Sequence, residues 1–258
     1  MKQTNSVGKP RQRWLPARYA SNARFVSNMA NPLLNLLAAK EGEVILDLGC
    51  GDGVLTNLIC NTGATAIGVD SSIDQIIATR KLGIQAVVMD GQNLAFKQIF
   101  DAILTNAALH WMTSPKEVIS GMWRSLKPGG RLVGEMGGAG NIKAITQAIY
   151  DVLGRRELEN KASFPWYFPE LKEYKEQLEI QGFDVKYIEQ FSRPTPLPGK
   201  LENWIDTFGE HFLFMLPEDD RIKFKEEVTE ALRPELYDPY NRWVADYVRL
   251  RFSAIRMV

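Results

Sequence analysis

The chain has 258 residues, 45% hydrophobic and 24% charged, as expected for one large α/β domain or a domain with an appended lobe. This composition excludes a disordered chain, a collagen and a coiled coil, and no uncharged apolar run approaches the ~20 residues of a membrane span. Lys and Arg together number 31, as do Asp and Glu, so the basic excess usual in nucleic-acid binders is absent. We therefore expect no nucleic-acid partner and no membrane partner.

Residues 1–14 and the cysteines bear on the compartment. Residues 1–14 are polar and basic and lack the apolar core of a secretory signal. The two cysteines, Cys50 and Cys60, are too few for a disulfide framework or a structural zinc site. The expected compartment is therefore a reducing cytoplasm, and no metal site is expected.

Three stretches follow one another along the chain. Residues 1–40 form a leader that is basic and proline-rich through Pro16 and then helical, with a break expected near Pro32. Residues 41–140 alternate short apolar runs with helical patterns, which indicates βαβ units and a parallel sheet. Residues 141–258 are richer in aromatic residues and in helical patterns.

The middle stretch contains five predicted strands. Val44–Leu48 is an apolar run interrupted only by Asp47, as expected for a strand buried on both faces. The other four are predicted at residues 65–69, 84–89, 102–105 and 131–136. Helices are predicted from Val54 to Gly63, from a cap at Ser71 or Ser72 to Gly83, and from a capping box at Ser114 to Pro128.

The last stretch is predicted to be largely helical. Helical patterns cover residues 141–153, 169–181, 202–216 and 218–232. A strand is predicted at Phe183–Phe191, followed by a proline-rich loop at Arg193–Gly199 and, later, by an apolar stretch at Asp246–Met257.

The turn Asp47-Leu48-Gly49-Cys50-Gly51-Asp52-Gly53 lies between the first strand and the first helix of the predicted sheet. Glycines there let the backbone lie directly against a ligand, at the carboxyl edge where open α/β sheets bind one. A simple tight turn is the plainer alternative. A nicotinamide dinucleotide fits poorly, because the third glycine comes one residue early and two carboxylates lie where a pyrophosphate would bind. S-adenosylmethionine, which is cationic and has no phosphate, suits these carboxylates better.

Two further acids end neighbouring strands. Asp70 ends the second strand, where an acidic residue accepts both hydroxyls of an unphosphorylated ribose; a helix cap is the alternative. Asp90 ends the third strand, where a carboxylate can accept an adenine amino hydrogen and an N–H near Gly91 can meet a ring nitrogen; an isolated surface acid is the alternative. Because Asp47 lies at the same edge, the cofactor interpretation is favoured.

With these motifs, the sequence resembles the class I S-adenosylmethionine-dependent methyltransferases. The matching motifs are DLGCGDG (47–53), GVDSS (68–72), MDGQNLAF (89–96), FDAILTNAALHWM (100–112) and LKPGGRLV (126–133). They occur in that family's order and spacing, over roughly the central third of the chain. The NAALHWM segment and the aromatic helices after it resemble the branch that contains trans-aconitate and malonyl-carrier-protein methyltransferases.

The resemblance implies a doubly wound, mostly parallel seven-stranded sheet with an antiparallel C-terminal hairpin at Phe183–Phe191 and Asp246–Met257. It also implies a helical cap (1–40), a cofactor-binding core (41–140) and a helical substrate lobe that carries the last two strands (141–258). The implied cofactor-binding residues are Tyr19, Arg24, Asp47, Gly49, Gly51, Asp70, Ser71, Asp90, Gly91, Gln92, Asn106 and Ala107. Among these, Tyr19 would close over the methionine end and Arg24 would pair with the cofactor carboxylate.

Methyl transfer from a sulfonium requires alignment and exclusion of water more than acid–base catalysis. His110, just after the fourth strand, is expected to orient a substrate oxygen or accept its proton, with a structural histidine as the alternative. Similar family members carry glutamine there, which favours positioning. Glu135, which ends the fifth strand, is expected to act as a base or bind an amine, with a solvated carboxylate as the alternative.

Aromatic residues are expected to form the acceptor site. Trp111, Trp166, Trp204 and His211 are predicted to contact the substrate together with His110, and packing within the lobe is the alternative. We expect O-methylation of a small-molecule carboxylate by a monomer or homodimer. The alternatives are N- or C-methylation of a metabolite, or a catalytically silent domain that binds S-adenosylmethionine.

Overall fold

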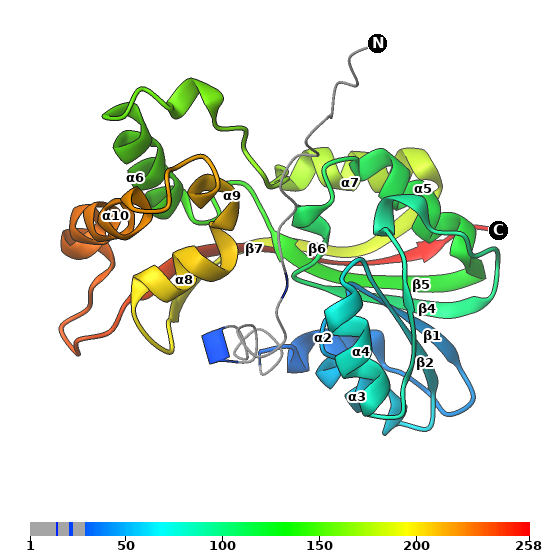
Figure 1. The fold of residues 1–258 in the computed structure, drawn as a ribbon. Helices are drawn as coiled ribbons and strands as arrows, with labels where there is room; N and C mark the ends of the chain where they lie inside the picture. Colours follow the sequence, from blue (N-terminus) through cyan, green and yellow to red (C-terminus); the bar gives the residue numbers. More distant parts are fainter. Residues whose placement is uncertain (1–13, 15–20, 23–28) are drawn as a thin grey trace, which may run out of the picture.

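The computed structural model describes Trp14, residues 21–22 and residues 29–258. Its centre is a seven-stranded sheet with the order β3-β2-β1-β4-β5-β7-β6 (Figure 1). The strands are β1 (Val44–Leu48), β2 (Thr65–Asp70), β3 (Gln85–Val88), β4 (Phe100–Asn106), β5 (Leu126–Gly137), β6 (Phe183–Pro196) and β7 (Val244–Arg256). Strands β1 to β5 are parallel, and β7 lies antiparallel between β5 and β6. The predicted sheet with an antiparallel C-terminal pair is confirmed.

Helices cover both faces of this sheet (Figure 1). On one face lie α2 (Asn31–Leu37), α3 (Val54–Cys60) and α4 (Ile73–Lys81), and on the other α5 (Pro115–Ser125) and α7 (Leu171–Gln181). Leu33 and Leu37 of α2 are buried in a core that includes Ile45, whereas Tyr174 of α7 packs in the opposite core with Phe252. Within the described part of the chain, no helix combines the length and apolar character needed to cross a bilayer.

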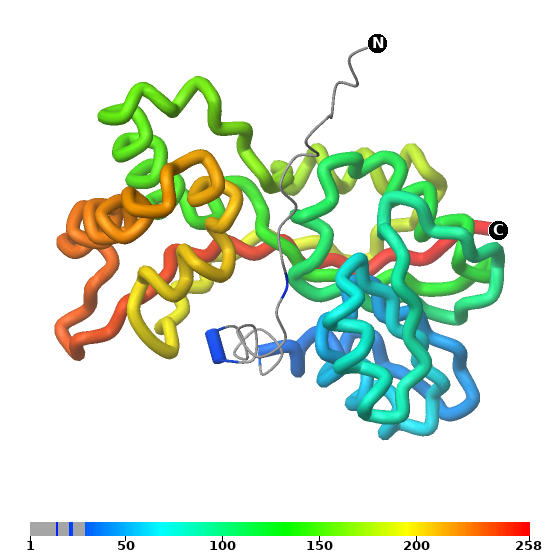
Figure 2. The backbone as a smooth tube through the Cα atoms, in the orientation of Figure 1, coloured from blue at the N-terminus to red at the C-terminus, as the bar shows by residue number. Residues whose placement is uncertain are grey.

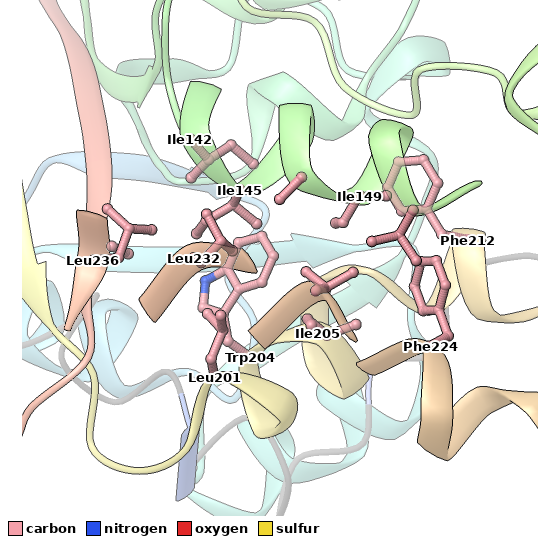
Figure 3. Packing of buried hydrophobic residues seen from close by; sticks show 14 of the residues in the cluster. Ile142, Ile145, Ile149, Leu201, Trp204, Ile205, Phe212, Phe224, Leu232 and Leu236 are labelled. Carbon is pink, nitrogen blue, oxygen red and sulfur yellow. The ribbon is translucent and has the colours of Figure 1, made fainter. Parts of the chain in front are cut away.

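The remaining helices form a separate lobe with its own apolar core. They are α6 (Lys143–Gly154), α8 (Leu201–Phe208), α9 (Glu210–Leu213) and α10 (Asp220–Leu236). Figure 3 shows residues of this core converging from α6, α8, α9 and α10, including Ile145, Trp204, Phe212, Phe224 and Leu232. The continuous backbone of β7 joins lobe and sheet (Figure 2), because Tyr247 is buried in the lobe core and Leu250 in the sheet core. The strand β7 therefore runs from the lobe core into the sheet core.

Several elements differ from the predicted ones. The predicted loop at 193–199 is wrong at its start, because β6 continues through Pro194 to Pro196. In the described part of the chain β6 is the outermost strand and pairs with β7 alone, so a residue without an N–H is tolerated there. The break predicted near Pro32 does agree with the structure, because residues 29–30 are not helical and α2 begins at Asn31, with Pro32 in its first turn, where its missing N–H costs nothing. The 202–216 helix divides at Gly209.

Of the predicted boundary signals, the cap at Ser72 agrees with the structure, and those at Ser114 and Pro128–Gly130 differ from it. Ser72 caps α4 as expected, by accepting a hydrogen bond from the Gln75 amide. Ser114 is the N-cap residue of α5, but its side chain makes no capping hydrogen bond with the described chain. The segment Pro128–Gly130, predicted to end the helix, belongs to the irregular first part of β5, because α5 already ends at Ser125. The division at residue 140 remains a prediction; α7, beyond it, packs on the sheet instead of the lobe.

Candidate active site

The glycine-rich turn after β1 forms the floor of the first part of the site. Gly49 has φ +78°, and a Cβ built on it would lie 2.2 Å from the Ala108 Cβ, so this position has no room for a side chain. Gly51 has φ +55°, and no described atom lies within 4 Å of a Cβ built there. The turn therefore presents bare backbone to an open space at Gly51, as a ligand-binding turn requires.

Asp70 lies beside this turn at the end of β2. Its Oδ2 accepts a hydrogen bond from the Gly51 amide (3.1 Å), and its Oδ1 accepts one from the Ser72 amide (2.8 Å). Each carboxylate oxygen retains a second lone-pair direction, so the pair suits the two hydroxyls of a ribose. Burial raises the pKa of the Asp70 carboxyl, and the two backbone hydrogen bonds oppose that shift. Ser71, the neighbouring predicted residue, is exposed.

Asp47 lies deeper, under the same turn. It is 1% exposed, and its Oδ2 accepts a hydrogen bond from the Thr56 hydroxyl (2.6 Å). Burial raises the pKa of Asp47 to about 7, the Thr56 hydrogen bond opposes this rise, and the nearby charge of Asp70 adds to it. Two buried carboxyl groups with raised pKa values favour a cationic ligand beside them and disfavour a phosphate.

The turn after β3 is held by hydrogen bonds and carries an exposed acid. Asp90 caps the short helical turn Gly91–Asn93 by accepting a hydrogen bond from the Gln92 amide (2.9 Å). The Gln92 side chain in turn accepts one from the Ser114 amide (2.9 Å). Gly91 is buried, and a Cβ on it would lie 2.6 Å from the Met112 methyl carbon. Asp90 is thus held in place with its carboxylate accessible, as contact with an adenine amino group would require.

These residues fit S-adenosylmethionine. The structure brings Gly49, Gly51, Asp47 and Asp70 to one sheet edge, and Asp90 ends the adjacent strand β3. The two leader residues predicted to bind the cofactor, Tyr19 and Arg24, lie outside the described residues.

The second part of the site begins at the end of β4. Ala107 has φ +53°, an uncommon conformation for a residue with a side chain, and its amide donates a hydrogen bond to the Glu135 carbonyl (2.8 Å). Ala107 and Asn106 line a small hollow of about 10 Å³ together with Glu135, Arg193 and Arg249. Ala107 and Arg249 also line a larger cavity. This strained residue therefore lies where the two hollows meet.

The larger cavity, of about 50 Å³, lies between the sheet and the lobe. Aromatic rings form most of its wall, from Trp14, Trp111, Trp166, Phe168, Trp204, Phe208 and Tyr247. The rings contact one another: Trp14 meets Trp111 edge-on at 4.8 Å, and Trp166 stacks on Phe168 at 5.8 Å. The polar residues in the wall are His110, Asn141 and Arg249. We call this space the aromatic cavity.

His110 is a neutral hydrogen-bond donor in this wall. Its Nδ1 accepts a hydrogen bond from the Gly137 amide (3.3 Å), so the ring proton is assigned to Nε2. Burial, and to a lesser degree the charge of Arg249, lower the pKa of His110 to about 3. The histidine is therefore uncharged at neutral pH, a weak base, and able to donate a proton from Nε2 in a hydrogen bond.

Glu135, the other predicted catalytic residue, is held by two arginines. Its carboxylate accepts hydrogen bonds from Arg193 (2.5 and 3.1 Å) and from Arg251 (2.8 and 2.6 Å), and the side chain is buried. Both carboxylate oxygens are therefore engaged by guanidinium groups. The role of Glu135 as a base remains a prediction, and this arrangement favours a structural role across β5, β6 and β7.

The aromatic cavity brings together most of the predicted substrate residues. His110, Trp111, Trp166 and Trp204 all line it. His211 does not belong to the described wall; its Nε2 lies 3.2 Å from the Ser163 hydroxyl. Trp166 and Trp204 are also part of the lobe core, so the packing alternative holds for them at the same time.

Arg249 is the cavity residue that sequence reasoning missed, together with Trp14, Asn141 and Tyr247. A signal for it exists: Arg249 and Arg251 interrupt an apolar stretch that becomes an interior strand. Buried arginines in such a strand need an anionic partner or ligand. For Arg251 that partner is Glu135, and the Arg249 guanidinium lies over the Tyr247 ring, 4.2 Å from its centroid.

Comparison with known proteins agrees with this geometry. A family model described as a methyltransferase domain matches residues 46–134. An uncharacterized methyltransferase of Schizosaccharomyces pombe, C70.08c, is 36% identical over 257 residues, 95% of this chain and 98% of that protein. Trans-aconitate 2-methyltransferase of Mycobacterium ulcerans is 30% identical over 146 residues, 56% of this chain and 55% of that protein. Phosphoethanolamine N-methyltransferase 2 of Haemonchus contortus, solved with S-adenosyl-L-methionine, has a TM-score of 0.56 at 19% identity over 88% of this chain and 53% of that chain, a likeness of fold alone.

Proposed function

The chain belongs to the class I S-adenosylmethionine-dependent methyltransferases, and from this we propose that it methylates a carboxylate oxygen of a small molecule, with S-adenosylmethionine as donor. The donor supplies a methyl group already activated on a sulfonium. In this proposal Asp70 binds the ribose, Asp90 the adenine, and the Gly49–Gly51 backbone the methionine part. Asn106 and Ala107 then lie next to the reacting carbon, at the entrance to the aromatic cavity.

The observation that supports a carboxylate acceptor is the pair of groups in the cavity wall, Arg249 and neutral His110. A guanidinium binds an anion, and the His110 Nε2 proton can be donated to one of its oxygens. A carboxylic acid with an ordinary pKa near 4 is already ionised at neutral pH and needs no base. The name of the Mycobacterium ulcerans relative, a trans-aconitate methyltransferase, adds support for an acid acceptor.

Methylation of a nitrogen or carbon atom is the alternative, and it requires a catalytic base that the surroundings of His110 and Glu135 do not provide. Such an acceptor has to lose a proton, which requires a base of suitable pKa near the reacting atom. His110 has its pKa lowered to about 3, and Glu135 is paired with two arginines. Positioning of an anion is therefore the role that we assign to His110.

The test uses S-adenosylmethionine carrying a radiolabelled methyl group, with pools of carboxylic acids, phenols and amines as acceptors. We expect the label in acids only, and we expect mild alkali to release it as methanol, because esters are labile and N-, C- and ether-linked methyl groups are not. Asp70→Ala, which removes the ribose contact, serves as the control without cofactor binding and should transfer no label. Alkali-stable label in an amine or phenol would contradict the proposal.

A further inference from the structure

We propose that Asn141 is a second acceptor-binding residue, and that its side-chain amide and His110 Nε2 act as a pair of neutral hydrogen-bond donors to the acceptor oxygens. The inference rests on the proposed carboxylate methylation and adds to it a residue that holds the acceptor.

Asn141 has a buried side chain with a fixed orientation. The residue is 4% exposed, and its Oδ1 accepts a hydrogen bond from the Val248 amide (3.0 Å). Because an N–H needs an oxygen to accept its bond, this contact also assigns the Nδ2 group, and Asn141 lines the aromatic cavity. Nδ2 carries two donor protons and makes no hydrogen bond with any described residue. Donors left without a partner in a buried amide are costly, so this group is suited to a ligand oxygen.

His110 presents a second donor in the same wall, and Gly137 contacts both residues. The Gly137 amide donates a hydrogen bond to His110 Nδ1 (3.3 Å), which assigns the ring proton to Nε2, and no described residue accepts that proton. A Cβ built on Gly137 would lie 2.7 Å from Asn141 Nδ2, so this position has no room for a side chain. The two donors therefore flank one glycine at the end of β5.

The loop that carries Asn141 is strained and held on both sides. Ile142, a β-branched residue of the cavity wall, has φ +51°. Its amide donates a hydrogen bond to the Asp246 carbonyl (3.0 Å), and the Ala144 amide donates one to Asp246 Oδ2 (2.7 Å). Backbone conformations of this kind persist where surrounding contacts impose them, and they cluster at sites that bind ligands. The loop therefore fixes the Asn141 amide before the acceptor arrives, which lowers the entropy cost of binding.

Neutral donors suit a carboxylate that has to react. Each carboxylate oxygen has two lone pairs, so an oxygen that accepts a hydrogen bond keeps one lone pair for the methyl carbon. That oxygen forms a bond to the methyl carbon as the carbon–sulfur bond breaks, the electron pair stays on sulfur, and no proton is released. The ester product is uncharged, so its hydrogen bonds to the two donors are weaker than those of the acid, which favours release.

The binding test titrates acetate into the protein saturated with S-adenosylhomocysteine. Nuclear magnetic resonance follows the side-chain amide protons of Asn141 and the Nε2 proton of His110. We expect both signals to move downfield with the same half-saturation, because one carboxylate contacts both groups. Acetamide should need a higher concentration, since hydrogen bonds to an anion are stronger. Movement of one signal alone, or of neither at molar acetate, overturns the inference.

The variant test separates the donor from a structural role. At pH 8, Asn141→Asp keeps an oxygen for the Val248 amide but has no donor, whereas Asn141→Ala loses both. With a pool of carboxylic acids far below saturation, Asn141→Asp should lower the rate of alkali-labile methyl transfer by about 10- to 100-fold, at least as much as Asn141→Ala. Binding of S-adenosylhomocysteine should be unchanged. If Asn141 only held Val248, Asn141→Asp would keep the wild-type rate and Asn141→Ala would not, which overturns the inference.

Gln190→Glu is the matched control, because it also changes an amide into an acid beside this loop. Gln190 Nε2 donates a hydrogen bond to the Ala139 carbonyl (3.3 Å), and Gln190 does not belong to the described cavity wall. The control should keep the wild-type rate, and a loss equal to that of Asn141→Asp would assign the effect to the loop and overturn the inference. These failures leave the proposed function standing, whereas label from the wild type in amines or phenols alone overturns the proposed function itself.

Discussion

Acidification should destabilise this protein through His110. The side chain is 7% exposed, and its surroundings lower its pKa from 6.5 to about 3. In the unfolded chain the histidine takes up a proton as the pH falls through 6.5, whereas in the folded protein it stays neutral until about pH 3. The unfolded state therefore binds more protons in this window, and stability is lost as the pH falls. At about 1.4 kcal/mol for each pKa unit, the loss at pH 5 is about 2 kcal/mol.

Urea unfolding of the wild type and of His110→Gln at pH 7 and pH 5 measures this term. Glutamine does not titrate, and the other titrating groups are common to both proteins, so they cancel in the difference. Between pH 7 and pH 5 the difference in unfolding free energy should move by about 2 kcal/mol in favour of the variant. A difference that stays constant would show that His110 is protonated in the folded protein as it is in the unfolded chain.

Activity provides a second readout of the same residue. If His110 positions an ionised carboxylate, the wild-type rate should have no acid limb near pH 6.5, and His110→Gln should lose less than His110→Ala. If it is a general base, both variants should lose about 10²–10⁴-fold. Equal large losses, with a wild-type acid limb that is absent from His110→Gln, would replace the positioning role by base catalysis.

Three further predictions concern the cofactor turn and the ion-paired glutamate. Asp47→Asn should raise the unfolding free energy at pH 8 by up to about 4 kcal/mol, because the pKa near 7 penalises the ionised carboxylate, and urea unfolding should show this gain vanish as the pH falls toward 4. Gly51→Ala should weaken S-adenosylhomocysteine binding at least 10-fold in calorimetry and cost only about 1–2 kcal/mol of stability. Gly49→Ala, whose Cβ would overlap Ala108, should lose far more stability, and similar thermal unfolding of the two would contradict this. Glu135→Gln should lower the unfolding free energy by about 3–5 kcal/mol, because two arginines lose their anionic partner; unchanged stability with lost activity would restore Glu135 as a base.

The fold of the central stretch was predictable because its signals are local. Each parallel strand from Val44 to Asn106 is a short apolar run, and its end is marked by an acid, glycine or asparagine that stays near the carboxyl edge. The residues of the proposed cofactor site follow directly from these ends. The predicted ends of β2 and β3 were enough to place Asp70 and Asp90 at the edge of the sheet.

The residues around the proposed acceptor site were not predictable in the same way, because they come from distant parts of the chain that are brought together by strand pairing. Arg249 reaches the cavity only because β7 pairs with β5, and the register that sets it opposite Gly137 has no local signature. Trp14 contacts Trp111 across almost a hundred intervening residues. The end of β6 was misjudged because prolines are turn signals in most contexts and are tolerated only in an outer strand, a property of the finished sheet.

The place of β7 in the sheet affects how the protein is made on the ribosome. Strand β7 is the last of the seven to be synthesised, yet it lies between β5 and β6. Until residues 244–256 have emerged, β5 has an unpaired edge and β6 has no neighbour, and unpaired edges are the surfaces through which nascent chains aggregate. Folding of the sheet is therefore completed only after residues 244–256 have emerged. A messenger RNA truncated before the codon for residue 244 would yield a chain that lacks Arg249 and both antiparallel strand pairings. We expect proteases to degrade such a chain.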